Sequence, residues 1–299
     1  MPLFDRYIAV DWSAANSPRR GKDSIWIGEC GPDGRVPSQN PPTRHAAMEA
    51  IVGRLLSARH RGERVMLGFD FVFGYPRGAA IAIAGQPDWR ALWRYLAANV
   101  ADTPDNGSNR FQLAEAINQR LPDGPHFWGH PHQHSYATLH PKRPTAAYAN
   151  IPERRVAERY VRSAQPVWKL TGVGSVGSQA MLGIARLATL RGDPRFADDI
   201  AVWPFETGFA DDLRKPIVIT EIYPSLFPVG EADGLPRDRA QVEVITRRFA
   251  ELDRAGLLAA FLGPPAGLTA EEHTILIAEE GWIAGAGHEA LLAQLRDAA

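Results

Sequence analysis

Three acidic residues in this sequence stand directly after short apolar runs. Asp11 follows Ile-Ala-Val, Asp70 follows Leu-Gly-Phe, and Glu221 follows Val-Ile-Thr. Carboxylates are rare inside buried strands, because removing a charge from water costs several kcal/mol unless something compensates. Acids at the ends of neighbouring strands would converge on one edge of a sheet. Their mutual repulsion would raise at least one pKa, unless a divalent cation neutralised the group.

Such a convergence predicts a metal-dependent reaction. Crowded oxygen ligands suit Mg²⁺ or Mn²⁺, and two such ions about 3.5–4 Å apart can activate water for phosphodiester hydrolysis. We therefore expect Asp11, Asp70 and Glu221 to bind Mg²⁺ or Mn²⁺ and to be catalytic. Asp238, at the start of the next predicted helix, is a fourth catalytic candidate, and simple capping of that helix would explain it equally well.

A glycine-rich stretch, GVGSVG at 172–177, precedes another predicted helix. Its spacing matches the dinucleotide fingerprint, but the segment before it is a poor strand and no acid ends the strand after it. Two interpretations of this stretch stay open. Its backbone N–H groups could bind a phosphate, or it could be a tight loop that packs the insertion against the core. Including a nearby basic run, the candidate phosphate- or cofactor-binding residues are Lys169, Ser175, Ser178, Gln179 and Arg155.

Five histidines gather between residues 126 and 140. Their spacing matches no compact zinc site, no cysteine is close, and Pro131 interrupts any regular strand. We expect these imidazoles to be solvated or hydrogen-bonded within the protein rather than metal ligands.

The elements that would position the acids begin with apolar strands. Segment 4–11 predicts a buried strand, 24–29 a second one, and a Gly-Pro-Asp-Gly turn leads to a short third strand. Residues 43–61 have the apolar stripe of an amphipathic helix, which Thr43 can cap. The continuously apolar segment 64–69 is typical of a central strand that is covered on both faces.

The middle of the chain has a different pattern. Predicted helices alternate there with loops rich in proline, glycine and histidine, at 88–100, 110–119, 153–163 and 178–190. Strands return at 200–205 and 216–223, and helices follow at 237–255, 269–280 and 287–297. We expect an α/β core formed by residues 1–74 and 198–299, with a helical, loop-rich insertion lobe at 75–197.

Composition restricts the class of protein. The 299 residues are 45% hydrophobic and 22% charged, enough to bury a full core. A net charge of −1 favours a small or specific substrate over a long nucleic-acid duplex. The single cysteine, Cys30, excludes an intramolecular disulfide and suits a reducing compartment. Because no leader pattern and no long apolar run occurs, we expect a cytoplasmic protein without a membrane partner.

Eight longer stretches of the sequence are informative when they are taken together. They are YIAVDWSA (7–14), GFDFVFGYP (68–76), FWG (127–129), GSVGSQ (174–179), WPFETG (203–208), TEIYPSL (220–226), DRAQV (238–242) and EEGWIAG (279–285). Together they resemble a bacterial family known as domain of unknown function 429, whose members are described as predicted nucleases of ribonuclease H-like fold.

The resemblance implies a fold and a site. The fold would be a ribonuclease H-like mixed sheet, with opening hairpin strands and parallel strands, flanked by helices. The site would be a metal-dependent acidic cluster at Asp11, Asp70 and Glu221. Nucleases of this fold commonly place another aspartate on a late helix, for which Asp238 is the nearest match and Asp253 lies farther along the same helix.

We therefore expect a metal-dependent phosphohydrolase, a nuclease acting on a nucleic-acid or nucleotide phosphodiester. One alternative is an ATP-dependent phosphotransferase of the actin and sugar-kinase superfold, which should contain a second, repeated lobe; the sequence shows no repeat. Another alternative is a non-catalytic ligand-binding module that keeps the acids as a sensor. The sequence gives no expectation about oligomeric state.

Overall fold

The computed structural model describes residues 1–299 except 146–147, 173, 231–233, 235 and 298–299. Its strands are β1 (Arg6–Asp11), β2 (Trp26–Cys30), β3 (Ser38–Gln39), β4 (Val65–Phe69), β5 (Ile200–Val202) and β6 (Ile217–Glu221). They form one mixed sheet in the order β3-β2-β1-β4-β6-β5. The first three strands are antiparallel neighbours, whereas β1, β4, β6 and β5 run parallel to one another.

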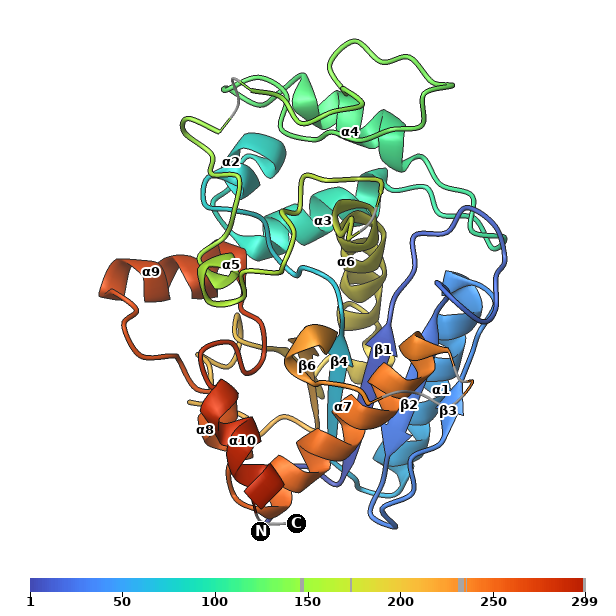
Figure 1. Cartoon of the computed structure of the whole chain (residues 1–299), viewed down its shortest axis with the longest axis vertical. Coiled ribbons are helices and arrows are strands. Elements are labelled where there is room, and N and C mark those ends of the chain that lie inside the picture. Colours follow the sequence, from blue (N-terminus) through green and yellow to red (C-terminus); the bar gives the residue numbers. More distant parts are fainter. Residues whose placement is uncertain (146–147, 173, 231–233, 235, 298–299) are drawn as a thin grey trace.

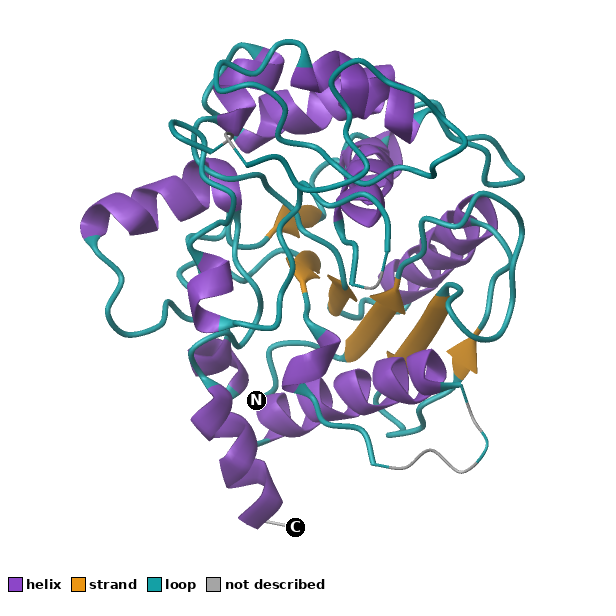
Figure 2. Ribbon diagram, turned by 45° about the horizontal axis from the view of Figure 1, so that its top comes forward, coloured by secondary structure: helices purple, strands orange, loops and turns teal. Residues whose placement is uncertain are grey.

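Helices cover both faces of this sheet (Figure 1, Figure 2). Helices α1 (Arg44–His60) and α6 (Gly177–Arg191) pack on the face that carries Val10 of β1 and Phe69 of β4. Helix α7 (Arg237–Arg254) packs on the other face. Since successive residues of a strand point to opposite faces, this alternation decides which strand-end acids can meet.

The remaining helical segments lie around this core. They are α2 (Ala79–Ala84), α3 (Trp89–Asn99), α4 (Arg110–Asn118), α5 (Ala157–Tyr160), η1 (Pro194–Phe196), η2 (Pro224–Leu226), α8 (Leu258–Phe261), α9 (Ala270–Ile275), the π-helical turn η3 (Leu276–Glu280) and α10 (Glu289–Asp297). In Figure 1, α2, α3 and α4 form a separate layer above the carboxyl ends of the strands. Over the described residues, none of these helices is long and apolar enough to cross a membrane.

The backbone of helix α7 packs directly against the backbone of the sheet. A Cβ atom added to Gly28 of β2 would lie 2.7 Å from the carbonyl oxygen of Val242. The helix therefore lies directly on β2, and its first turn, with Asp238, is held near the end of the hairpin formed by β1 and β2.

The fold confirms most of the expected elements. The first four strands and α1 lie where they were predicted, and the Thr43 side chain accepts a hydrogen bond from the N–H of Ala46. Of the helix expected at 153–163, only the four residues of α5 are helical. Before α5, the backbone N–H of Arg155 donates to the carboxylate of Glu158, and that of Val156 donates to the carboxylate of Glu280. These bonds satisfy N–H groups at the start of α5 that the first turn of a helix leaves without a backbone partner.

Candidate active site

Asp11 and Asp70 lie at the ends of β1 and β4, the two adjacent strands from which the chain continues toward opposite edges of the sheet. From β1 the chain continues to β2 and β3 on one side, and from β4 it reaches β6 and β5 on the other. In sheets of this kind, ligands bind beyond the carboxyl ends of the strands at such a switch point. Val10 pairs with Phe69, so Asp11 and Asp70 follow neighbouring positions of two adjacent parallel strands.

The two carboxyl groups are within hydrogen-bonding reach of each other. The backbone N–H of Trp12 donates to Asp70 Oδ1 at 2.6 Å, and the N–H of Asp70 donates to the carbonyl of Val10. Both side chains are partly buried. Desolvation, followed by the charges of Asp70 and Asp238, raises the pKa of Asp11 well above its usual range. Desolvation also raises the pKa of Asp70 to about 7, against the opposing bond from Trp12.

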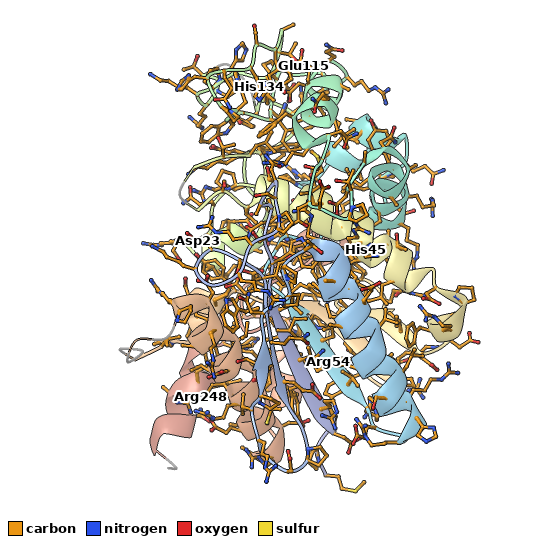
Figure 3. All side chains as sticks on the ribbon, turned by 90° about the vertical axis from the view of Figure 1, so that its right-hand side faces the viewer. Asp23, His45, Arg54, Glu115, His134 and Arg248 are labelled. Carbon is orange, nitrogen blue, oxygen red and sulfur yellow. The ribbon has the colours of Figure 1, made fainter. Side chains whose placement is uncertain are left out.

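Asp238 and Asp23 complete the acidic surroundings of this pair. The charge of Asp238 acts on both strand-end aspartates and that of Asp23 on Asp11. Asp238 Oδ2 accepts the backbone N–H of Asp23 at 2.7 Å, which ties the loop between β1 and β2 to the start of α7. Figure 3 labels Asp23 on this loop. The other candidate on α7, Asp253, is buried at the opposite end of β1, where it accepts the N–H groups of Leu3 and Phe4.

Glu221 has a different environment from the two aspartates. Phe69 is its register partner, so strand alternation directs Glu221 toward the α6 face and Asp70 toward the α7 face. Its oxygens accept hydrogen bonds from Arg155 at 2.6 and 2.8 Å and from the N–H of Phe73 at 3.0 Å. The expected three-carboxylate cluster is therefore a pair in this structure, and the role of Glu221 as a metal ligand stays a prediction.

Arg155 is buried and fully used within the protein. Its five N–H donors are accepted by Glu158, by Glu221 and by the carbonyl oxygen of Glu280. The exposed fractions of Arg155, Glu158 and Glu221 are only 2%, 4% and 3%. This geometry leaves no Arg155 donor for a phosphate. We therefore assign Arg155 to holding Glu221 instead of the phosphate contact expected from the sequence.

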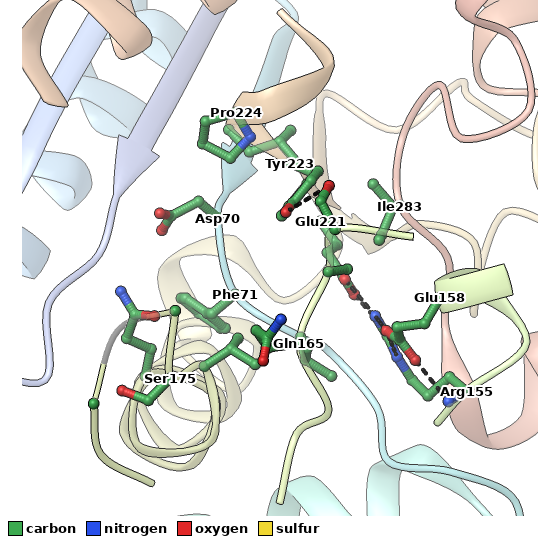
Figure 4. A pocket seen from close by; sticks show the side chains of 18 residues that line it. Asp70, Phe71, Arg155, Glu158, Gln165, Ser175, Glu221, Tyr223, Pro224 and Ile283 are labelled. Atoms are coloured by element: carbon green, nitrogen blue, oxygen red, sulfur yellow. Dashed lines mark hydrogen bonds and ion pairs between the residues drawn. The ribbon is translucent and has the colours of Figure 1, made fainter. Parts of the chain in front are cut away.

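A cavity of about 320 Å³ opens beside Asp70 (Figure 4). Five of the residues singled out from the sequence line it: Asp70, Arg155, Ser175, Gln179 and Glu221. Figure 4 shows the ion pairs of Arg155, Glu158 and Glu221 on one side of the cavity and Asp70 on another. Gln179 also donates its side-chain N–H to the carbonyl of Trp12, so α6 is attached to the end of β1.

Two members of the predicted phosphate loop have other surroundings. Ser178 is buried and donates its hydroxyl to the carbonyl of Leu170. Lys169 Nζ lies over the ring of Trp128, 5.8 Å from its centroid. Val173, within the same glycine-rich stretch, lies outside the described residues.

Two of the histidines are hydrogen-bonded within the protein, as expected. His126 is buried, with ring nitrogens near the carbonyls of Gly124 and Ile151, and His130 Nδ1 contacts the carbonyl of Pro131. In Figure 3, His134 lies at the far end of the molecule from the sheet, near Glu115. This cluster is therefore separate from the strand-end aspartates.

The structure adds residues that the sequence patterns did not single out. Glu158 is buried and accepts two hydrogen bonds from the Arg155 guanidinium. Glu280 is buried in the EEGWIAG stretch and accepts the N–H groups of Arg77 and Val156. Gln165, in a loop before a proline, lines the cavity. Glu280 could have been suspected from its place in a characteristic stretch, whereas nothing in the sequence marks Gln165.

The donor set at Asp11 and Asp70 fits a hard divalent cation that keeps several waters. Within the described ranges, no three His, Cys, Asp or Glu side chains are grouped so that they could hold a metal. Mg²⁺, however, is commonly bound in proteins by one or two carboxylates together with waters and substrate phosphates. Asp11 and Asp70 would be the residues that hold it. Such an ion would replace the proton that their raised pKa values retain.

Metal affinity should therefore depend on pH. Because the raised pKa of Asp70, about 7, keeps a proton in the pair below neutrality, proton and cation compete there. We expect the affinity for Mn²⁺ to rise by up to about tenfold per pH unit as the pH increases toward 7, where Asp70 releases its proton. Isothermal titration calorimetry between pH 5.5 and 8.5 measures this. An affinity that does not change with pH would contradict the shared proton.

Comparison with known protein families, with curated proteins and with solved structures finds no match for this chain. The family resemblance described above therefore stays a prediction, and the site has to be interpreted from its own geometry.

Proposed function

We propose that this protein is a metal-dependent phosphohydrolase that acts on a nucleic-acid or nucleotide phosphodiester. The observation that carries the proposal is the Asp11–Asp70 pair at the switch point of a parallel sheet, with carboxyl groups in mutual reach and raised pKa values. A pair with this geometry favours a bound divalent cation over two free carboxylates.

Each residue of the site has a proposed role. Asp11 and Asp70 hold Mg²⁺ or Mn²⁺, which would polarise a phosphoryl oxygen and lower the pKa of a bound water. Asp238, across from them on α7, orients water or extends the ligand set through water. Glu221, Arg155 and Glu158 form the far wall of the cavity and hold the ends of β4 and β6 in register.

The architecture supports the proposed class. A hairpin opening followed by parallel strands, with helices on both faces, is the arrangement expected for a ribonuclease H-like core. The six strands belong to one sheet, whereas the phosphotransferase alternative calls for a second, repeated lobe. The unpaired, buried Cys30 is compatible with the cytoplasmic location that we propose.

A direct test uses the full chain and bis(p-nitrophenyl) phosphate, a small phosphodiester that requires no base recognition. We expect release of p-nitrophenol that depends on Mn²⁺ or Mg²⁺ and stops with a chelator. Mn²⁺ binding without hydrolysis of this ester, of dinucleotides or of single-stranded DNA would favour the binding-module alternative. Consumption of ATP only in the presence of an acceptor would favour the phosphotransferase.

A further inference from the structure

The cavity beside Asp70 contains polar groups that no protein group uses. Among the residues that the structure describes, the Gln165 amide and the Ser175 hydroxyl line the cavity and have no hydrogen-bond partner. Most other polar side chains of the lining are engaged: Arg155 with Glu158 and Glu221, Gln179 with Trp12, and Tyr223 with Ser163. The Gln165 amide therefore offers one donor side and one acceptor side to a ligand.

The glycine-rich loop fixes the position of this amide. A Cβ atom on Gly174 would lie 3.1 Å from Gln165 Cγ, so the loop backbone packs against the stem of the glutamine. Gly174 also has a φ of +70°, a conformation that favours glycine. Gln165 is partly buried in this packing, with its amide group toward the cavity (Figure 4).

The charges of the lining argue against a long polyanion. The acids are Asp70, Glu158 and Glu221, and the one base among the described lining residues is Arg155, whose donors are all taken. Nucleic-acid chains bind mainly through phosphate contacts to lysine and arginine, which this wall does not offer. A volume of about 320 Å³ is at the lower end of small-molecule pockets. The cavity therefore fits one small ligand with few charges.

We propose that this cavity binds a single nucleotide, with its phosphate at the Asp11–Asp70 end and its base edge hydrogen-bonded to Gln165. A glutamine amide recognises adjacent donor and acceptor groups on a base, as it does with adenine. Ser175, which also lines the cavity, provides a further hydrogen bond, and Tyr223 and Pro224 form the wall on the Asp70 side (Figure 4). This inference rests on the proposed function for the position of the phosphate, and it assigns Gln165 as the residue that determines specificity.

Binding measurements with three probes test the assignment: AMP, ribose 5-phosphate, which lacks the base, and a ten-residue single-stranded DNA. In the presence of Mn²⁺ we expect the full chain to bind AMP at least tenfold more tightly than ribose 5-phosphate. We expect Gln165→Ala to weaken AMP binding about tenfold, the worth of a good amide–base pair, and to leave ribose 5-phosphate binding unchanged. Gln112→Ala, which removes an exposed glutamine of α4, is the matched control and should change neither.

A second variant tests the position of the amide without removing it. Gly174→Ala forces the loop against the Gln165 stem and should reduce AMP binding more than ribose 5-phosphate binding.

The outcomes separate this inference from the proposed function. Equal AMP binding by Gln165→Ala and the unmodified protein would overturn it, and so would a lack of AMP binding at millimolar concentration. DNA that binds more tightly than AMP, with the same affinity in Gln165→Ala, would show a nucleic-acid site instead. The hydrolysis of bis(p-nitrophenyl) phosphate has no base to recognise. If the unmodified protein does not hydrolyse this ester, the phosphohydrolase proposal is contradicted, whereas the difference in AMP affinity between Gln165→Ala and Gln112→Ala tests the present inference by itself.

Discussion

Replacement of Asp11 by asparagine is expected to abolish metal-dependent hydrolysis, with a decrease of about 10³-fold or more. The variant keeps the shape of the side chain and removes the charge that would hold the ion with Asp70. Asp70 keeps its bond from the Trp12 N–H in either case, so the end of β4 should remain in place. The rate of Mn²⁺-dependent p-nitrophenol release measures the effect.

The same substitution should stabilise the metal-free protein. The folded state holds a proton on the pair at pH values where the unfolded chain has released it, because both pKa values are raised on folding. Stability from this proton is complete below about pH 4 and is lost as pH rises through 7. The neutral amide of the Asp11→Asn variant has no charge to repel Asp70, so we expect a gain of about 1–2 kcal/mol near pH 8.

The opposite signs of these two effects make the result easy to interpret. Lost activity with a raised melting temperature cannot come from misfolding. Asp33→Asn, at an exposed turn, is the control and should change neither quantity. An Asp11→Asn variant with full activity would remove this residue from the site.

Replacement of Arg155 by methionine is expected to cause the largest loss of stability, about 3–5 kcal/mol. The change leaves Glu158 and Glu221 buried without their counter-ion, and it also removes the donor to the carbonyl of Glu280. Because β6 ends at Glu221, the far wall of the cavity should loosen. Chemical denaturation followed by circular dichroism measures the loss.

Arg159→Met is the matched control, since Arg159 lies only four residues farther along the chain, in α5, and its side chain is exposed in its ion pair with Glu272. We expect its effect to stay below about 1 kcal/mol. If Arg155→Met does not fold, Arg155→Lys keeps the charge and should show an intermediate loss. Adding Glu221→Gln to Arg155→Met should recover part of the stability. A melting temperature of Arg155→Met equal to that of the unmodified protein would contradict the buried ion-pair assignment.

The sequence predicted the sheet well because its strands are short, apolar and bounded by turns. Asp11 and Asp70 could be recognised as site residues because a charge directly after a buried strand is costly without a partner. Glu221 follows its strand in the same way, yet it faces the other side of the sheet. Only the register of β6 against β4, which depends on contacts distant in sequence, reveals this difference.

The environment of Arg155 could not be predicted from the sequence either. A run of basic residues predicts a solvated or phosphate-binding surface, but Arg155 is enclosed by carboxylates from β6 and α5 and by a carbonyl from η3. The start of α5 also depends on a distant residue, because the Glu280 side chain from η3 accepts the N–H of Val156. Gln165 matters only through its place in the cavity, which no local pattern encodes.

The most direct test of the central claim, that Asp11 and Asp70 bind a divalent cation together, is calorimetric titration of Mn²⁺ at pH 8 into matched variants. We expect the unmodified protein and Asp33→Asn to bind Mn²⁺ with similar affinity. Asp11→Asn and Asp70→Asn should each lose at least tenfold, since each removes one of two charged ligands. Unchanged Mn²⁺ affinity in both aspartate variants would contradict the account.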